Sequence, residues 1–287
     1  MSCITAQNTG QNGLCHDPAG PIVGAWVSAS PISITIANAK LEASIKALMV
    51  VSDMDERLIP LVYKTDPEVK QQREAKEVVA GNGEVTQLGI GNAQYLISVR
   101  SPNWYEVQKK LISGMNSGSF YAIMVTSNGT LIGNESTDGL SIEGKPVKVG
   151  KMLVDAEGYE SEQMLQFTIS ETDAAGDLEK YLTVKPTAYN PSTLKGVSDV
   201  TVTEVSAAAL EVVCTVTVKG NSDWNVTTLN TDGTNFTLGT GTVSSAAYSS
   251  TTGQWTLVTV GAATGALNVV PLAADSYMFE GSTTITV

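Results

Sequence analysis

Histidine is almost absent from this sequence. His16 is the only one among 287 residues, and Cys15 stands beside it. A zinc site needs two further ligands, and only Cys3 is close in sequence. A Ser-His-Asp or Cys-His catalytic centre would have to use this same histidine near the start of the chain. We therefore expect no metal site, no cofactor and no catalytic residues, so that the protein is not an enzyme.

Basic residues are scarce as well. Lys and Arg number 17 against 29 Asp and Glu, which leaves a net charge of −12. A surface that captures nucleic acid needs a stripe of basic residues, so this charge argues against nucleic-acid capture. It does not exclude a channel through which nucleic acid slides without sticking.

Long apolar runs are also missing. No stretch of 18 or more apolar residues occurs, which predicts no transmembrane helix, and the first 20 residues lack the basic and apolar regions of a signal peptide. The three cysteines, Cys3, Cys15 and Cys214, are an odd number, and nothing indicates an oxidising compartment. A Cys3–Cys15 disulfide remains open, but we expect free thiols and folding in a cytoplasm.

Thr, Ser, Gly, Val and Ala dominate what is present, and charged residues make up 16%. This composition favours a mainly β, antiparallel fold, and 287 residues suffice for two domains. The Gly89-Ile90-Gly91 sequence indicates a bend or bulge within the longest predicted strand. In the first domain, strands are predicted over 28–39, 43–51, 58–64, 84–100, 140–145, 147–154 and 165–169.

The most charged stretch is 66–77, with four acidic and three basic residues and almost no apolar face. A helix here would have no stripe to hold it against a core. The stretch is either a solvated loop or a projecting arm that reaches a neighbouring subunit, and Gly81-Asn82-Gly83 ends it. On the second interpretation the interface residues are Asp66, Glu68, Lys70, Arg73, Glu74, Lys76 and Glu77.

One amphipathic helix is predicted over 101–114. Ser101 is a suitable N-cap, Pro102 suits the first helical position, and Gly114 can end the helix in a left-handed conformation. Four apolar residues recur at the spacing of a single buried face that would pack on a sheet. These residues are Trp104, Val107, Leu111 and Ile112.

A β-hairpin is predicted directly after this helix. Its strands cover 120–126 and 130–133, and Ser127-Asn128-Gly129 connects them. Asn-Gly is the signal of a two-residue type I′ turn.

The segment 186–191, PTAYNP, reads as a linker because its two prolines mark a change in composition. It divides the chain into an N-terminal arm over 1–24, a β domain over 25–188 and a second β domain over 189–287. In the second domain charges nearly vanish and short strands recur between Gly and Asn turns, which predicts an Ig-like β-sandwich. Residues 210, 212, 214, 216 and 218 alternate strictly as apolar positions of a half-buried strand.

Two tryptophans fall within predicted strands of this second domain. Trp224 and Trp255 are expected to be core residues rather than platforms for sugar rings.

The order of these features resembles the tail-tube family of bacteriophages, especially versions from phages of Bacteroidetes and crAss-like phages. The features are a long alternating strand, one short capped helix and a hairpin with Asn-Gly-Thr-Leu-Ile-Gly. A strand ending in Asp155-Ala156-Glu157-Gly158-Tyr159 and the tripeptide Gln166-Phe167-Thr168 follow. The resemblance covers about residues 1–185 and rests on the order of the motifs.

The resemblance implies a β-sandwich or barrel with one flanking α-helix, six copies of which close into a ring. Rings stack into a tube through the charged segment 66–83 and the N-terminal arm, and DNA passes through the lumen without specific binding. The chain would then be a structural virion protein of the tail, assembled in the bacterial host cytoplasm with other tail proteins and without membrane insertion. The Ig-like domain would face outward and could contact host surface glycans.

Three alternatives remain. A tail ring or adaptor shares the same fold. A head-fibre or decoration protein that binds host glycans would explain the Ser- and Thr-rich second domain. A β-sandwich glycosidase needs two supporting carboxylates in a cleft, and nothing in the sequence selects a pair.

Overall fold

The computed structural model describes residues 21–62, 68–71, 75–79, 85–99, 120–155, 164–173, 180–208, 210–219 and 221–285. The predicted helix over 101–114, with Trp104, Val107, Leu111 and Ile112, lies outside the described residues, as do positions 1–20 of the predicted arm. The described chain is mainly β with antiparallel sheets, which confirms the predicted fold class at that level. It forms two compact units, the first within 21–42, 60–99 and 119–194 and the second within 43–59 and 195–285.

The first unit is built on a sheet that branches at β8. One edge of β8 pairs with β1, while its other edge pairs with β11 near Phe120 and with β9 near the following turn. One branch continues through β9, β10 and β2, and the other through β11, β12, β7 and β4. The strands are β1 (Ile22–Ser28), β2 (Ser33–Thr35), β3 (Ile59–Val62), β4 (Glu68–Gln71), β7 (Gln94–Val99), β8 (Phe120–Thr126), β9 (Leu131–Glu135), β10 (Ser141–Glu143), β11 (Lys145–Asp155), β12 (Met164–Glu171) and β13 (Tyr181–Val184).

The core of this unit lies around β1 and β8. Both strands carry consecutive buried residues rather than alternating ones, as expected for strands covered on both faces. Trp26 in β1 and Ile123 in β8 face each other across the ladder and are fully buried. These two strands therefore form the base on which the outer branches are built.

The predicted hairpin over 120–133 is confirmed, but its turn differs from the prediction. The N–H of Gly129 donates to the carbonyl of Thr126 at 2.9 Å, and Gly129 has φ = 78°. This pattern is a three-residue connection that ends in a left-handed glycine, whereas a type I′ turn would have two central residues. The Thr126 hydroxyl accepts from the N–H of Thr130 at 2.9 Å, which favours the wider turn.

One predicted strand is wrong in part and another is wrong throughout. The stretch 28–39 is a strand only at Ser28 and over β2, and α1 (Ile36–Ala39) follows; 43–51 is not a strand but belongs mostly to α2 (Glu42–Met49). Thr35 caps α1, because its hydroxyl accepts from the N–H of Asn38 at 3.3 Å. Ile45 and Met49, four residues apart, share the buried face of α2.

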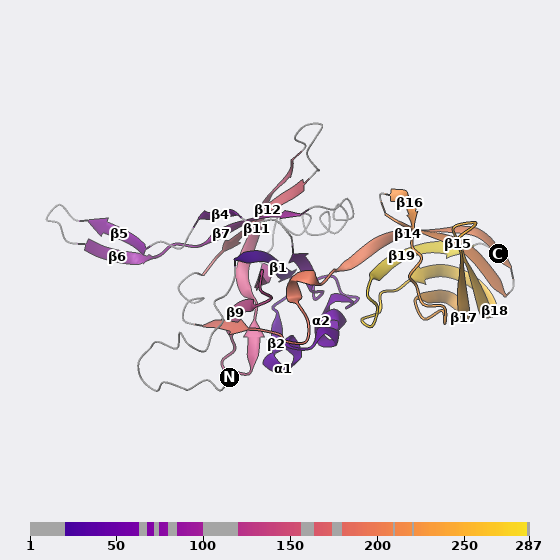
Figure 1. Ribbon diagram of the computed structural model, residues 1–287, viewed down its shortest axis with the longest axis horizontal. Helices are drawn as coiled ribbons and strands as arrows, with labels where there is room; N and C mark the ends of the chain where they lie inside the picture. The colour runs from indigo at the N-terminus through magenta and orange to yellow at the C-terminus, as the bar shows by residue number, and fades with distance from the viewer. Residues whose placement is uncertain are drawn as a thin grey trace. The chain divides into compact units, whose positions relative to one another are not determined.

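Among its described residues, the second unit contains six strands in the order β16-β15-β14-β19-β18-β17, and an additional β15–β18 pairing closes a ring of β15, β14, β19 and β18. Figure 1 draws these strands in orange to yellow. The β14–β19 pairing is parallel and the others are antiparallel. An Ig-like sandwich remains a prediction for this unit. Its strands are β14 (Val197–Ala208), β15 (Glu211–Val218), β16 (Asn221–Asn225), β17 (Phe236–Ser249), β18 (Gln254–Val269) and β19 (Met278–Ile285), and the 3-10 helix η1 (Pro191–Thr193) precedes them.

The core of the second unit is centred on Trp255 and on the alternating strand β15. Val212, Cys214, Val216 and Val218 are buried, which confirms the predicted alternation from position 212 onward. The Trp255 indole N–H donates to the carbonyl of Val226 at 2.8 Å, so its polar atom is satisfied inside the core.

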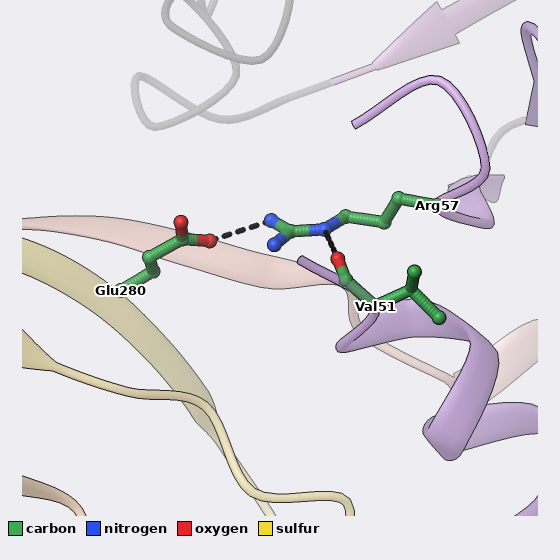
Figure 2. A network of polar contacts seen from close by, with 3 residues as sticks. All are labelled: Val51, Arg57 and Glu280. Carbon is green, nitrogen blue, oxygen red and sulfur yellow. Dashed lines mark hydrogen bonds and ion pairs between the residues drawn. The ribbon is translucent and has the colours of Figure 1, made fainter. Parts of the chain in front are cut away.

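The segment 43–59 is tied to the second unit by a polar network around Arg57 (Figure 2). The Arg57 guanidinium donates to the carbonyl of Val51 at 2.7 Å and to the Glu280 carboxylate at 2.5 Å. Lys46 donates to the carbonyl of Asp275 at 3.1 Å. The domain boundary predicted between residues 188 and 189 remains a prediction. The segment 43–59, which precedes this boundary in sequence, belongs to the same compact unit as 195–285.

Candidate functional site

The charged stretch singled out in the sequence forms strands where the structure describes it. Glu68 and Lys70 lie in β4, and Lys76 and Glu77 lie in β5 (Ala75–Val79). The solvated-loop interpretation is therefore wrong for these four residues. The other proposed interface residues, Asp66, Arg73 and Glu74, lie outside the described residues.

These strands are successive parts of one long antiparallel hairpin. β4 pairs with β7, with Glu68 opposite Leu96 and Gln71 opposite Gln94. β5 pairs with β6 (Val85–Ile90), from Ala75 opposite Ile90 to Val79 opposite Val85. In both pairings the partner's residue number falls as the chain advances, so the two strand pairs follow one another along the chain, although β5 and β6 form a two-stranded sheet of their own. We call β5 and β6 the hairpin arm and β4 and β7 its root.

The predicted interruption near Gly89 is confirmed in two places. The ladder shifts register between Lys76 and Glu77, which lie opposite Gly89 and Gln87 and leave Leu88 as the extra residue of a bulge. The strand itself then breaks over 91–93, between β6 and β7. The arm and its root are thus separate strand pairs within one hairpin.

Three strand edges of the hairpin have no strand partner among the described residues. β4 pairs only with β7, and β5 and β6 pair only with each other. β7 is different, because it lies between β4 and β12. Unpaired edges present backbone N–H and C=O groups that can pair with another chain, so this hairpin offers a template for association.

Three valines at the far end of the described part of the arm are exposed. Val78, Val79 and Val85 are 50%, 65% and 53% exposed, and Val79 lies directly opposite Val85. A two-stranded hairpin alone is at best marginally stable in water, and exposed β-branched residues at its end gain from burial against a partner. The hairpin arm thus combines strand edges that lack a partner among the described residues with exposed valines, and both are typical of surfaces that contact another protein.

Sequence reasoning identified this segment through its charges and missed the valines. The informative signal was Asn82-Gly83 between the β-branched residues of 78–79 and Val85, since Asn-Gly between such residues indicates a hairpin. Charge alone cannot separate a loop from a pair of strands, because both accept charged residues.

The described part of the chain shows no cluster of side chains that could hold a metal ion, because it contains no suitable group of three or more His, Cys, Asp or Glu. Burial raises the pKa of the Cys214 thiol to about 12, so this cysteine stays protonated and is a poor nucleophile at neutral pH. Cys3, Cys15 and His16 lie outside the described residues.

The two tryptophans of the second unit have opposite environments. Trp255 is buried, as predicted, but Trp224 is 65% exposed on β16, so the prediction that it belongs to the core is wrong. The physical reason is its position on a terminal strand of the sheet, because β16 pairs only with β15 in the described chain. An exposed indole on such a strand is a second candidate contact surface.

A comparison with models of protein families matched none of them, and a comparison with curated protein sequences found no similar one. Among the described residues, no helix has the length and apolar character needed to cross a membrane.

Proposed function

We propose that the protein is a structural virion protein, a phage tail-tube subunit whose copies form stacked rings around a DNA conduit. The observation that supports this function best is the hairpin arm, an extended strand pair with exposed valines and with edges that lack a partner among the described residues. The order of motifs that resembles tail-tube proteins supports the same proposal. Six copies per ring is the number that the resemblance implies.

Association through the arm has a clear physical driving force. Complete burial of one valine side chain contributes roughly 1.5–3 kcal/mol, so covering three that are already half buried contributes about 2–4 kcal/mol per copy. Pairing of open edges adds backbone hydrogen bonds, and a closed ring removes the edges altogether. A contact repeated around a ring therefore needs only a modest contribution from each copy.

The net charge of −12 is compatible with a DNA conduit. DNA is polyanionic, so an acidic lumen disfavours binding and lets the strand pass without adhesion. In this proposal the partners are other copies of the chain and other tail proteins, assembly takes place in the host cytoplasm, and no cofactor or membrane insertion is involved.

Negative-stain microscopy of the purified full-length chain tests the proposal, with a variant that lacks 75–90 and joins β4 to β7 through a short Gly-Ser turn. We expect rings or tubes from the wild type and soluble, folded monomers from the variant. Tubes of normal length from the variant would contradict the role of the arm. Single short rings from the wild type at high concentration would favour the tail-ring or adaptor alternative.

The exposed Trp224 favours one alternative of another class, a decoration protein that binds host surface glycans. An indole face stacks on the C–H groups of a sugar ring, and Asp223 and Asn225 beside it are exposed polar residues. Isothermal titration calorimetry of the Trp224→Ala variant and of the wild type with host surface polysaccharide distinguishes this alternative from the tail-tube proposal, because the heat of binding does not depend on the tryptophan that is removed. Binding that is lost in the variant would support this alternative, and equal signals from both proteins would exclude Trp224 as the platform.

A further inference from the structure

A buried carboxylate lies where the hairpin arm leaves the main sheet. Glu171 is the last residue of β12, and the side chains of Glu171 and Lys145 are 1% and 2% exposed. The Lys145 ammonium lies 3.7 Å from one Glu171 oxygen and 5.4 Å from the centroid of the Tyr181 ring. Two charges removed from water are costly unless their remaining polar atoms are also satisfied. The second oxygen of Glu171 accepts a further hydrogen bond, which gives the buried ion pair a structural role.

That second oxygen binds the junction between β6 and β7. The ladder of β12 and β7 runs regularly to Ser170 opposite Gln94, which makes Ala93 the next partner of Glu171. The N–H of Glu171 donates to the carbonyl of Ala93 at 3.0 Å, one of the two bonds of a regular antiparallel pair. The N–H of Ala93 instead donates to the Glu171 side chain at 3.3 Å. The carboxylate thus replaces a backbone carbonyl at the point where the strand breaks.

We propose that Glu171 is the positioning residue of the hairpin arm, acting through its side-chain oxygen on the N–H of Ala93. A break in a strand leaves backbone groups without ladder partners, and a buried N–H without a partner costs about 1–3 kcal/mol. Glu171 satisfies this donor from a fixed place, because Lys145 holds the other oxygen. The arm can then end its pairing with the main sheet at 91–93 without losing a defined connection to it.

The effect of Glu171 on assembly rests on the proposed function, because a contact between copies through the hairpin arm needs the arm in one orientation. An arm free to pivot about 91–93 would lose conformational entropy on each association, which weakens assembly without removing any contact at the tip. The consequence for the subunit alone is independent of assembly. Residues 85–93 should be protected from hydrogen exchange in the monomer.

Two double variants separate the hydrogen bond from the charges. Both K145M/E171Q and K145M/E171L remove the buried ion pair with side chains of similar size, an exchange that buried pairs often tolerate. Only glutamine keeps an oxygen for the N–H of Ala93. The single variant E171Q keeps both that oxygen and the lysine.

Hydrogen exchange by mass spectrometry on the full-length monomeric fraction gives the test. We expect peptides covering 85–93 to exchange about tenfold faster or more in K145M/E171L than in K145M/E171Q, with β8 and β15 unchanged in both. Equal exchange over 85–93 in the two variants overturns the proposal. If neither double variant folds, E171Q decides: protection close to wild type supports the role of the oxygen, and faster exchange over 85–93 overturns it.

Microscopy of the same variants distinguishes this inference from the proposed function. Unprotected arms with normal tubes would refute the role of the arm in assembly and leave Glu171 as its positioning residue. Protected arms without assembly in the wild type would refute the proposed function alone.

Discussion

Arg57 and Glu280 form an ion pair at 2.5 Å although 223 residues separate them in the chain. Both belong to the second compact unit, so a short segment near the start of the chain completes a unit made mostly from its end. The Arg57 side chain is buried, whereas that of Glu280 is about one-third exposed. The ion pair is partly screened for that reason, and the hydrogen bond to the carbonyl of Val51 adds to it.

This relationship predicts a stability effect in the second unit. Arg57→Met keeps the apolar stem and removes both donors, which should lower the free energy of unfolding by about 1–3 kcal/mol. Glu211→Gln, at an exposed residue of the same unit, is the control and should stay within about 0.5 kcal/mol. Urea unfolding followed by tryptophan fluorescence measures both. Equal effects of the two substitutions would show that the Arg57 network contributes nothing specific.

Substitution of the exposed valines of the hairpin arm should weaken assembly and leave folding unchanged. Val79→Ser with Val85→Ser removes the exposed cross-strand pair, and a loss near 1.4 kcal/mol per contact raises the concentration needed for assembly about tenfold. Because both valines already face water, the melting temperature should hardly change. Sedimentation against concentration provides the measurement. The matched control is Val258→Ser with Val260→Ser, at exposed valines of β18, and identical assembly of the two double variants would argue against the tip as the contact.

The burial of Cys214 should make the free energy of unfolding depend on pH in the alkaline range. Burial raises its pKa to about 12, whereas a thiol in the unfolded chain titrates near about 8.5. Between these values the unfolded chain binds fewer protons than the folded one, so the thiol's contribution is complete below about pH 8.5 and is lost as the pH rises through this window. Unfolding in urea at pH 7, 9 and 10.5 should show a smaller decline for Cys214→Ala than for the wild type. Parallel declines would show that Cys214 does not ionise on unfolding.

Thiol labelling gives an independent check of the same burial. In a Cys3→Ser, Cys15→Ser background, Ellman's reagent should not react with the folded protein at pH 8 and should react with one thiol in urea. Rapid reaction of the folded protein would contradict the buried position of Cys214.

A side chain added at Gly281 should clash with Val200 in the core of the second unit. A Cβ added to it would collide with the carbonyl oxygen of Val200 and lie 2.7 Å from a methyl group of the same residue. Gly281→Ala should therefore destabilise the protein by roughly 1–3 kcal/mol, as overpacking does elsewhere. Gly150→Ala is the control, because nothing lies within 4 Å of the added carbon, and thermal unfolding compares the two. A stable Gly281→Ala protein would mean that β14 and β19 can separate without cost.

Local signals in the sequence were sufficient where neighbouring residues decide the structure. The alternation of Val212, Cys214 and Val216 predicted β15, and Asn128-Gly129 predicted a hairpin, because side-chain period and turn chemistry are properties of a few consecutive residues. The strand prediction over 43–51 was wrong although local signals for a helix were present. Ala, Lys, Leu and Met are good helix formers, and Ile45 and Met49 share one buried face at helical spacing.

Tertiary structure alone decided which side chains meet and which remain in water. Trp224 is exposed on the terminal strand β16 and Trp255 is buried on β18, so the burial of each depends on the place of its strand in the sheet. Charge in the sequence marked the hairpin as unusual. Which of its strand edges lack a partner among the described residues, and the contact of the Glu171 carboxylate with Ala93, depend on strands far apart in the chain. Periodicity is a local property, whereas burial and pairing are set by long-range contacts.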